Sequence, residues 1–159
     1  RQALGHLCRK LPQRSTYLSC TRWKAGQEFL SLDYKAKSTF CLEPAGDTLG
    51  RKSVADDYAM GCIPVFFGPA ATYQYPELWQ GWHKDAYVVV DRERFISKPW
   101  DVLRTLRTVP QSRIDTILQA IARHGGRFQF SSGTYPAAPD AVDMMLRQLD
   151  ADARNITQL

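Results

Sequence analysis

The sequence lacks most of the features that would assign a function at first sight. Its 159 residues contain no run close to the ~20 apolar residues of a transmembrane helix, and no signal peptide opens the chain. They contain neither a GxxxxGK[ST] phosphate-binding loop nor a GxGxxG dinucleotide fingerprint. No run of Lys and Arg exceeds two residues and no nucleic-acid-binding module is recognisable, so we expect no nucleic-acid partner.

The cysteines also lack the CxxC spacing of a zinc site. They are Cys8, Cys20, Cys41 and Cys62. Their even number permits two disulfides in an oxidising compartment, and four buried thiols fit the spacing equally well, so the pairing stays open. Asn155 begins an Asn-Ile-Thr glycosylation sequon, which has meaning only in a secretory protein.

What the chain does contain is the composition of one globular domain. Hydrophobic residues make up 44% and charged residues 23%, and 159 residues can bury a sizeable core. A net charge of +5 favours an anionic partner, such as a phosphate-bearing ligand. Because the chain begins with Arg1 rather than Met, we expect residues 1–159 to be a single domain of a longer protein.

Apolar runs separated by helical patterns predict an α/β fold. The expected strands are residues 38–42, 63–67 and 86–90. Helices are expected around residues 4–11 and 29–35, over 49–60 and 112–124, and from residues 99 and 140. Strands that are apolar throughout, with helices between them, are typical of a parallel sheet covered on both faces.

Polar residues and proline mark the expected helix starts. Asp47 or Thr48 is expected to cap the helix over 49–60, and Ser112 and Asp140 to cap the two later ones, with Pro99 suited to a first turn. The residues of the 49–60 helix that are expected to face the core are Val54, Ala55, Tyr58 and Ala59.

The loop between the first two expected strands is the best candidate for a ligand site. In a parallel sheet, ligands collect beyond the carboxyl ends of the strands, and residues 43–50 lead from such an end to a helix start, where an anion is favoured. Gly46 and Gly50 permit close approach of the backbone. Arg51 and Lys52 place cations in a first turn where acidic side chains are usual.

One turn deeper, Ser53 and Asp56 lie three residues apart and share a helix face. A carboxylate there can accept both hydroxyls of a ribose, so the sequence predicts a pocket for a nucleotide diphosphate. The alternative is an ordinary surface, on which Lys52 and Asp56 form an i,i+4 ion pair and Asp47 is only a cap.

The stretch that carries these residues, FCLEPAGDTLGRKSVADDYAMGCIPVFF, also carries a family resemblance. It resembles the exostosin-like glycosyltransferases of family GT47, in particular the plant-type branch that includes xyloglucan galactosyltransferases. The pattern of that branch is roughly FCLxPxGDxxxRxSxFDxxxxGCxPVFF. The similarity is dense within residues 38–68 and looser through ATYQYPELW and AYVVV.

The resemblance implies a GT-B fold of two Rossmann-like halves, with this chain as the C-terminal, donor-binding half. It implies transfer of a sugar from a UDP-sugar to a hydroxyl of a glycan acceptor, with inversion and without a metal or other cofactor. It also implies a type II membrane protein of the Golgi lumen, anchored outside this sequence. The catalytic base is then expected in the half that precedes Arg1, so the isolated fragment is expected to be inactive. The alternative is a donor half that binds a nucleotide sugar or glycan without catalysis.

By position in the motif, the residues implied to bind the donor are Gly46, Asp47, Thr48, Arg51, Lys52, Ser53 and Asp56. Arg51 falls on the family's basic residue near the diphosphate, where it would stabilise the leaving phosphate, and Asp56 on the acidic residue that resembles the ribose ligand. Three positions depart from the pattern: Lys52 replaces an Arg, Ala55 a bulky apolar residue, and Asp57 a small apolar one. Asp57 leaves open which of the two aspartates faces the ribose.

The expected loop over residues 68–84 is rich in aromatic side chains and follows the second strand. Tyr73 and Tyr75, together with Trp79, can stack on a sugar or on uracil, and they can equally form local core under a long loop.

Overall fold

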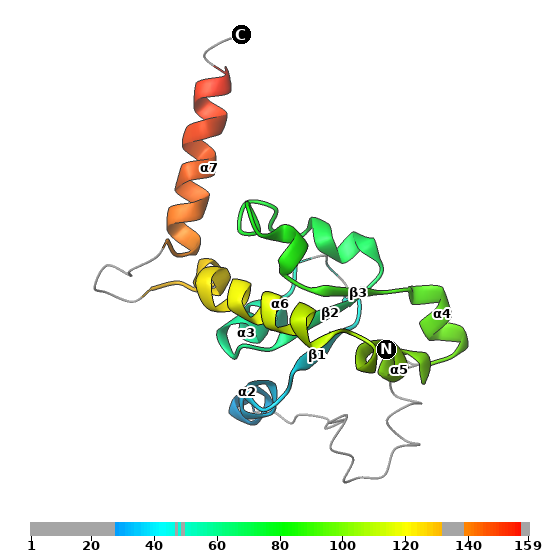
Figure 1. The fold of residues 1–159 in the computed structure, drawn as a ribbon. Helices are drawn as coiled ribbons and strands as arrows, with labels where there is room; N and C mark the ends of the chain where they lie inside the picture. Colours follow the sequence, from blue (N-terminus) through cyan, green and yellow to red (C-terminus); the bar gives the residue numbers. More distant parts are fainter. Residues whose placement is uncertain (1–27, 47, 49, 132–138, 157–159) are drawn as a thin grey trace.

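The structure, a computed structural model, is a parallel α/β sheet with helices on both faces (Figure 1). It describes residues 28–46, 48, 50–131 and 139–156. The expected Rossmann-like α/β arrangement is therefore confirmed. The helix expected around residues 4–11 lies outside the described residues, as do Cys8, Cys20 and Asp47.

In the described part of the chain, three strands form the sheet in the order β1 (Phe40–Glu43), β2 (Ile63–Phe67) and β3 (Val88–Val90), each parallel to its neighbour. The bounds of β2 are those predicted. β1 ends one residue later than expected, because Glu43 continues the strand opposite Phe66 instead of entering a turn. β3 begins two residues later, since the buried Ala86 directs its carbonyl oxygen to the Tyr58 hydroxyl, which donates to it at 3.0 Å.

The described α-helices are α2 (Glu28–Ala36), α3 (Lys52–Ala59), α4 (Arg92–Ser97), α5 (Asp101–Arg107), α6 (Gln111–His124) and α7 (Ala141–Ile156). Short 3₁₀ segments are η1 (Pro69–Tyr73), η2 (His83–Asp85) and η3 (Gly125–Phe128). The sequence did not predict α4, which begins after Asp91, whose carboxylate accepts a hydrogen bond from the Arg94 N–H at 2.6 Å. In Figure 1, α7 extends away from the sheet.

The core has one part on each face of the sheet. On one face, α3, α6 and the chain between β2 and β3 bury Val54, Tyr58, Phe66, Trp79 and Ile117. On the other face, α4 and α5 pack Phe95, Val102 and Leu106 against Val65 and Val90. Each such side chain contributes about 1.5–3 kcal/mol when fully buried. With both faces covered, the loops gather at the two ends of the strands, and these ends are where a site can form.

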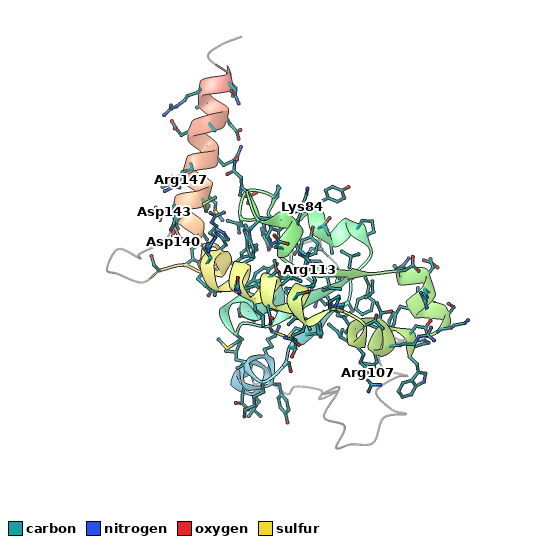
Figure 2. All side chains as sticks on the ribbon, viewed as in Figure 1. Lys84, Arg107, Arg113, Asp140, Asp143 and Arg147 are labelled. Atoms are coloured by element: carbon teal, nitrogen blue, oxygen red, sulfur yellow. A yellow bond between two sulfur atoms is a disulfide. The ribbon has the colours of Figure 1, made fainter. Side chains whose placement is uncertain are left out.

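The start of α7 is as predicted. Asp140 Oδ1 accepts hydrogen bonds from the N–H groups of Val142 and Asp143 at 2.9 and 3.0 Å, and Figure 2 shows Asp140 and Asp143 together at the base of the helix. The expected cap of α6 is wrong, because the N-cap is Pro110, with extended backbone, two residues before Ser112.

The expected cap of α3 is also wrong. The helix begins at Lys52, and Arg51 occupies the N-cap with extended backbone (φ −132°, ψ 123°). Thr48 lies too early to cap it, and its hydroxyl donates to the Gly50 carbonyl at 2.9 Å. Of the residues expected to face the core, Val54 and Tyr58 are buried and Ala55 half-buried, whereas Ala59 is exposed.

Cys41 and Cys62 form a disulfide that joins β1 to the start of β2, with Cα atoms 5.8 Å apart. Of the two alternatives, disulfides or buried thiols, the disulfide is therefore correct for Cys41 and Cys62. A cross-link over 21 residues restricts the unfolded chain and so stabilises the fold. Within the described ranges, no helix combines the length and the apolar character needed to cross a bilayer.

Candidate functional site

Arg51 ends the loop from β1 to α3 at the carboxyl edge of the sheet, and its side chain contacts the residues where that loop begins. Its Nη1 donates to the Pro44 carbonyl oxygen, and its Nε lies 3.4 Å from Glu43 Oε2. A Cβ atom on Gly46 would lie 3.2 Å from Arg51 Nη1, so the missing side chain gives the guanidinium its room. The Arg51 side chain is 24% exposed. Because a guanidinium has five N–H donors, these contacts orient its plane and leave donors for an anion.

The first turn of α3 has little negative charge of its own. No side chain in the described part of the chain caps it, and its first turn holds no acidic residue. Lys52 is 84% exposed, and its Nζ lies 2.7 and 2.9 Å from the two carboxylate oxygens of Asp56. The i,i+4 pair anticipated as the alternative is therefore present. Such an exposed pair contributes only about 0.3–0.5 kcal/mol, so a ligand can displace it.

The chain after β2 lies against the β1–α3 loop. The Arg51 N–H donates to Gln74 Oε1 at 3.2 Å, and the Gln74 amide donates to the Ala71 carbonyl at 2.8 Å. A Cβ atom on Gly50 would come within 2.6 Å of Tyr75 Oη, so the two segments meet where only glycine fits. Tyr75 itself has φ 52°, a left-handed conformation uncommon outside glycine. The two carboxyl-edge segments thus form one continuous surface.

A polar cluster lies beneath this surface, and we call it the inner cluster: Lys35 of α2, Glu43 of β1, and Ser53 and Asp57 of α3. Lys35 Nζ donates to the hydroxyl and carbonyl oxygens of Ser53, each at 3.0 Å, and to Asp57 Oδ1. It also lies 3.4 Å from Glu43 Oε1, which accepts a hydrogen bond from Ser53 Oγ at 2.5 Å. The cluster therefore ties three elements together directly under the loop.

Asp57 is fully buried, and its Oδ2 has no hydrogen-bond partner among the residues that the structure describes. Burial raises the pKa of Asp57 to about 8; the charge of Glu43 adds to the rise and Lys35 opposes it. This rise in pKa reduces the negative charge on Asp57 near neutral pH, and Glu43 is the carboxylate that contacts both Lys35 and Arg51. The positive charge of Lys35 and Arg51 is then only partly balanced, which suits an anionic ligand.

The two adjacent aspartates, Asp56 and Asp57, differ in how far they are buried. The Asp57 carboxylate is enclosed and bonded to Lys35, so it is out of reach of a ligand, whereas the Asp56 side chain is 24% exposed. The Ser53 hydroxyl is engaged with Lys35 and Glu43, so the structure does not bring Ser53 and Asp56 into one set of contacts. Of the two aspartates, Asp56 is the one available at the surface.

An Asp57 carboxylate oxygen and the sulfurs of Cys41 and Cys62 lie within 4.8 Å of one another, the spacing of a metal site. The two sulfurs are bonded to each other, so they are not the thiolates that bind a metal ion. This group is therefore part of the core.

The aromatic residues after β2 divide between core and surface. Trp79 is fully buried, and its indole N–H donates to Tyr58 Oη at 3.0 Å, which matches the local-core alternative. Tyr75 is half-buried, with its ring edge-to-face against Phe128 at 6.0 Å between centroids. Tyr73 is 73% exposed at the end of η1, so its ring is open to a ligand.

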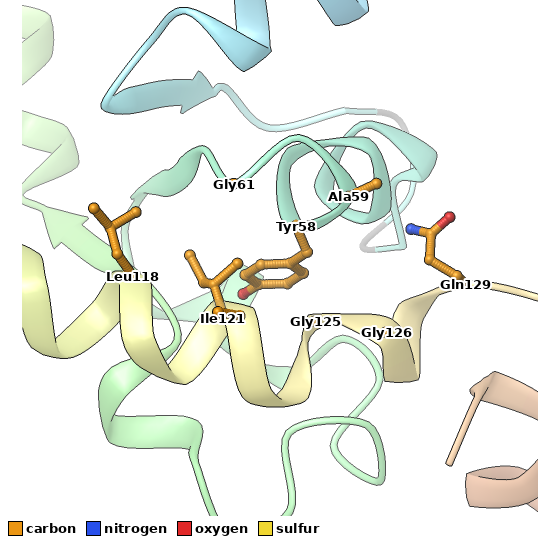
Figure 3. Close-up of a pocket in the computed structure, with 9 residues that line it drawn as sticks. Tyr58, Ala59, Gly61, Leu118, Ile121, Gly125, Gly126 and Gln129 are labelled. Carbon is orange, nitrogen blue, oxygen red and sulfur yellow. The ribbon is translucent and has the colours of Figure 1, made fainter. Parts of the chain in front are cut away.

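A hollow of about 440 Å³ lies elsewhere, at the amino end of β2 between α3 and α6 (Figure 3). Its described lining includes Tyr58, Gly61, Ile121 and Gln129, and among the described residues it contains no charged side chain and none of the predicted donor-binding residues. Without a cation it has nothing to neutralise a diphosphate. The hollow therefore does not replace the carboxyl edge as the candidate site.

The inner cluster holds two residues that were not considered for the site, Lys35 and Glu43, together with Asp57, which was considered only as the alternative to Asp56 for the ribose. Asp57 had a signal in the sequence, because it lies with Val54 and Tyr58 at i, i+3 and i+4, on the inward face of the helix. Glu43 directly follows the strand expected over residues 38–42. Its burial would have been predicted only if that strand had been extended by one residue. Lys35 joins the cluster because α2 docks on α3, which no spacing in the sequence indicates.

The model of the exostosin GT47 domain matches residues 2–106, which include the sheet and α3. Three similar proteins from Arabidopsis thaliana are glycosyltransferases. Xyloglucan-specific galacturonosyltransferase 1 is 34% identical over 107 residues, 67% of this chain and 16% of the relative. Probable xyloglucan galactosyltransferase GT15 is 39% identical over 85 residues, 53% and 15% of the two chains. Probable xyloglucan galactosyltransferase GT17 is 30% identical over 125 residues, 78% and 27%.

No solved structure is a significant match to the chain. The chain spans between 15% and 27% of the length of these three relatives. The family match covers more than half of the chain and includes the β1–α3 loop, Arg51 and the inner cluster. The chain therefore belongs to the exostosin GT47 family and is similar to its plant xyloglucan-type glycosyltransferases.

Proposed function

We propose that this chain is the donor-binding half of a glycosyltransferase that transfers a sugar from a UDP-sugar to a glycan hydroxyl, with inversion. The observation that carries the proposal is the start of α3. There, Arg51 and Lys52 lie at an edge of a parallel sheet where no described side chain caps the helix. A helix that starts with cations and has no acidic residue in its first turn favours a bound phosphate.

In the proposed complex, the diphosphate lies over the β1–α3 loop. Arg51 donates to phosphate oxygens with the N–H groups that Glu43 and Pro44 leave available, and Gly46 lets the ligand approach the backbone. Asp47 and Thr48 belong to the same loop. Asp56 accepts the ribose hydroxyls, which releases Lys52 from its pair and frees its ammonium for the phosphates.

Ser53 supports this site from below, through its contacts with Lys35 and Glu43. The exposed ring of Tyr73 is the better placed of the two tyrosines to stack on the base or the sugar, because Tyr75 is half-buried beside Gly50.

The reaction proposed is a displacement at the anomeric carbon. An acceptor hydroxyl forms the new bond, the bond from carbon to the β-phosphate oxygen breaks, and the hydroxyl proton passes to a base supplied by the other half of the protein. Negative charge develops on the departing UDP, and the Arg51 guanidinium and the α3 start stabilise it. These donors take the place of a divalent metal at the diphosphate.

The names of the relatives extend the proposal to the setting of the protein. They refer to xyloglucan, so the acceptor proposed is a plant cell-wall glycan of that kind. A Golgi enzyme anchored outside this chain fits the same family. The Cys41–Cys62 disulfide supports an oxidising compartment of this type.

Titration calorimetry of the protein with UDP, GDP and CDP, in the presence of EDTA, tests the proposal. We expect UDP to bind best, and Arg51→Ala to weaken UDP binding about tenfold or more, since hydrogen bonds to charged groups contribute about 1.5–3 kcal/mol. Arg147→Ala, on the exposed side of α7, is the matched control and should bind UDP as the wild type does. A folded wild-type protein that does not bind UDP, or an equal loss in both variants, would contradict the proposal. Binding without transfer by the full-length protein would favour the non-catalytic alternative.

A further inference from the structure

The two carboxylate oxygens of Glu43, at the end of β1, have different partners. Its Oε1 accepts from Ser53 Oγ at 2.5 Å and lies 3.4 Å from Lys35 Nζ, on the inner side. Its Oε2 lies 3.4 Å from Arg51 Nε, on the side of the loop. The side chain is buried, so the carboxylate needs these partners to offset its lost hydration.

The Arg51 guanidinium is held at two of its three nitrogens by two consecutive residues. Glu43 meets Nε, and the Pro44 carbonyl oxygen accepts from Nη1. Glu43 is itself part of the sheet, where it pairs with Phe66, so its backbone is fixed by β2. The plane of the guanidinium is therefore set by the rigid end of a strand, and its remaining donors are directed by that constraint.

Ser53 and Lys35 fix the other oxygen of Glu43. Lys35 Nζ is held in turn by the Ser53 carbonyl and by Asp57, so the Glu43 carboxylate has a defined orientation before Arg51 contacts it. The contact at Oε2 reaches a partly exposed arginine at the sheet edge, which is where a positioning role would be needed.

We infer that Glu43 is a positioning residue of the donor site, which orients Arg51 toward the diphosphate and is itself oriented by Lys35 and Ser53. This inference rests on the proposed function. Its specific consequence is that loss of the Glu43 charge impairs recognition of the phosphates and leaves recognition of the nucleoside unchanged.

Calorimetry of Glu43→Gln with UDP and with uridine tests this. Glutamine keeps the shape and the hydrogen bond with Ser53 but loses the charge that attracts Arg51. We expect the affinity for UDP to fall about tenfold, with the affinity for uridine unchanged. In an Arg51→Ala background, Glu43→Gln should produce no further loss, because it acts through Arg51. Glu93→Gln, which alters a Glu–Arg pair on α4, is the matched control and should bind both ligands as the wild type does.

The outcomes separate this inference from the proposed function. If the wild type binds neither ligand, the proposed function fails and the inference with it. If the wild type and Glu43→Gln bind UDP equally, or if Glu43→Gln loses UDP and uridine in parallel, the positioning role is wrong while the UDP site stands. Gly46→Ala tests the same geometry if Glu43→Gln does not fold, because its Cβ would press on Arg51 Nη1 from 3.2 Å. This variant should also have a lower affinity for UDP and an unchanged affinity for uridine. Unchanged UDP binding would overturn the inference.

Discussion

The starts of α7 and α3 are built in opposite ways. At α7, Asp140 Oδ1 accepts from the N–H groups of Val142 and Asp143, and its Oδ2 accepts from the hydroxyl and N–H of Ser131 at 2.6 and 3.0 Å. The Ser131 hydroxyl and these backbone bonds lower the pKa of Asp140 to about 2. This helix start therefore carries its own anion, and its hydrogen bonds serve the fold.

At α3, the N-cap residue is Arg51, whose side chain makes no capping hydrogen bond, and the first turn, which begins with Lys52, holds no acidic residue. An acidic cap would stabilise this helix, as Asp140 stabilises α7. Helix α3 therefore gives up a local stabilisation that another helix of the chain uses. A bound anion would supply the missing charge.

The largest effect expected is on ligand binding by Arg51→Ser. Serine is a good N-cap, so it restores a capping side chain while it removes the guanidinium. We expect UDP affinity to fall about 10- to 100-fold. The thermal midpoint should stay close to that of the wild type, because the new cap offsets the lost contacts of Arg51. Calorimetry measures the UDP affinity and thermal denaturation the midpoint, on the same sample. Unchanged UDP binding would show that the start of α3 does not differ from that of α7 in binding an anion through Arg51.

The converse change, Asp140→Ala, should affect stability alone. It removes the acceptor for the first turn of α7 and for Ser131, so the thermal midpoint should fall by several degrees while UDP affinity is unchanged. Because the pKa of Asp140 is lowered, its stabilising contribution is present above about pH 4 and is lost as the pH falls toward 2. Denaturation at pH 5 and pH 3 should show the difference between variant and wild type shrinking at the lower pH.

Asp57 should show the opposite pH dependence. Its pKa is raised from 3.8 to about 8, so between these values the folded state binds more protons than the unfolded state, and stability falls as the pH rises. Asp57→Asn cannot ionise, so the stability of this variant should improve relative to the wild type from pH 5 to pH 8. Urea denaturation at both pH values measures this. A constant difference would mean that Asp57 is ionised throughout this range.

The smallest effect expected is that of Lys52→Ala. The pair with Asp56 is exposed, so its loss should change the free energy of unfolding by no more than about 0.5 kcal/mol. UDP affinity should fall a few-fold at low salt and less at high salt, because an exposed charge is screened. Titrations at two salt concentrations check this, and a loss as large as that of Arg51→Ser would show that Lys52 is the main phosphate contact.

The sequence predicted those parts of the fold that depend on local pattern. The bounds of β2 and the cap at Asp140 followed from an apolar run and a capping residue. The start of α3 did not, because Thr48 bonds within its own loop and Arg51 takes the N-cap.

The candidate site was predictable to a similar extent. Its location followed from the motif around Arg51, but the inner cluster depends on how α2, β1 and α3 pack, and Lys35 is 22 residues from its partner Asp57. Long-range ion pairs of this kind leave no periodic pattern in a sequence. Packing likewise determines that Trp79 is buried and that Tyr73 is exposed.

The location of UDP on the protein, measured from backbone amide shifts in a two-dimensional NMR titration, would test the proposed site. We expect the largest shifts on Gly46, Gly50 and residues 51–54. Shifts concentrated instead around Tyr58, Ile121 and Gln129, in the hollow at the amino end of β2, would contradict it.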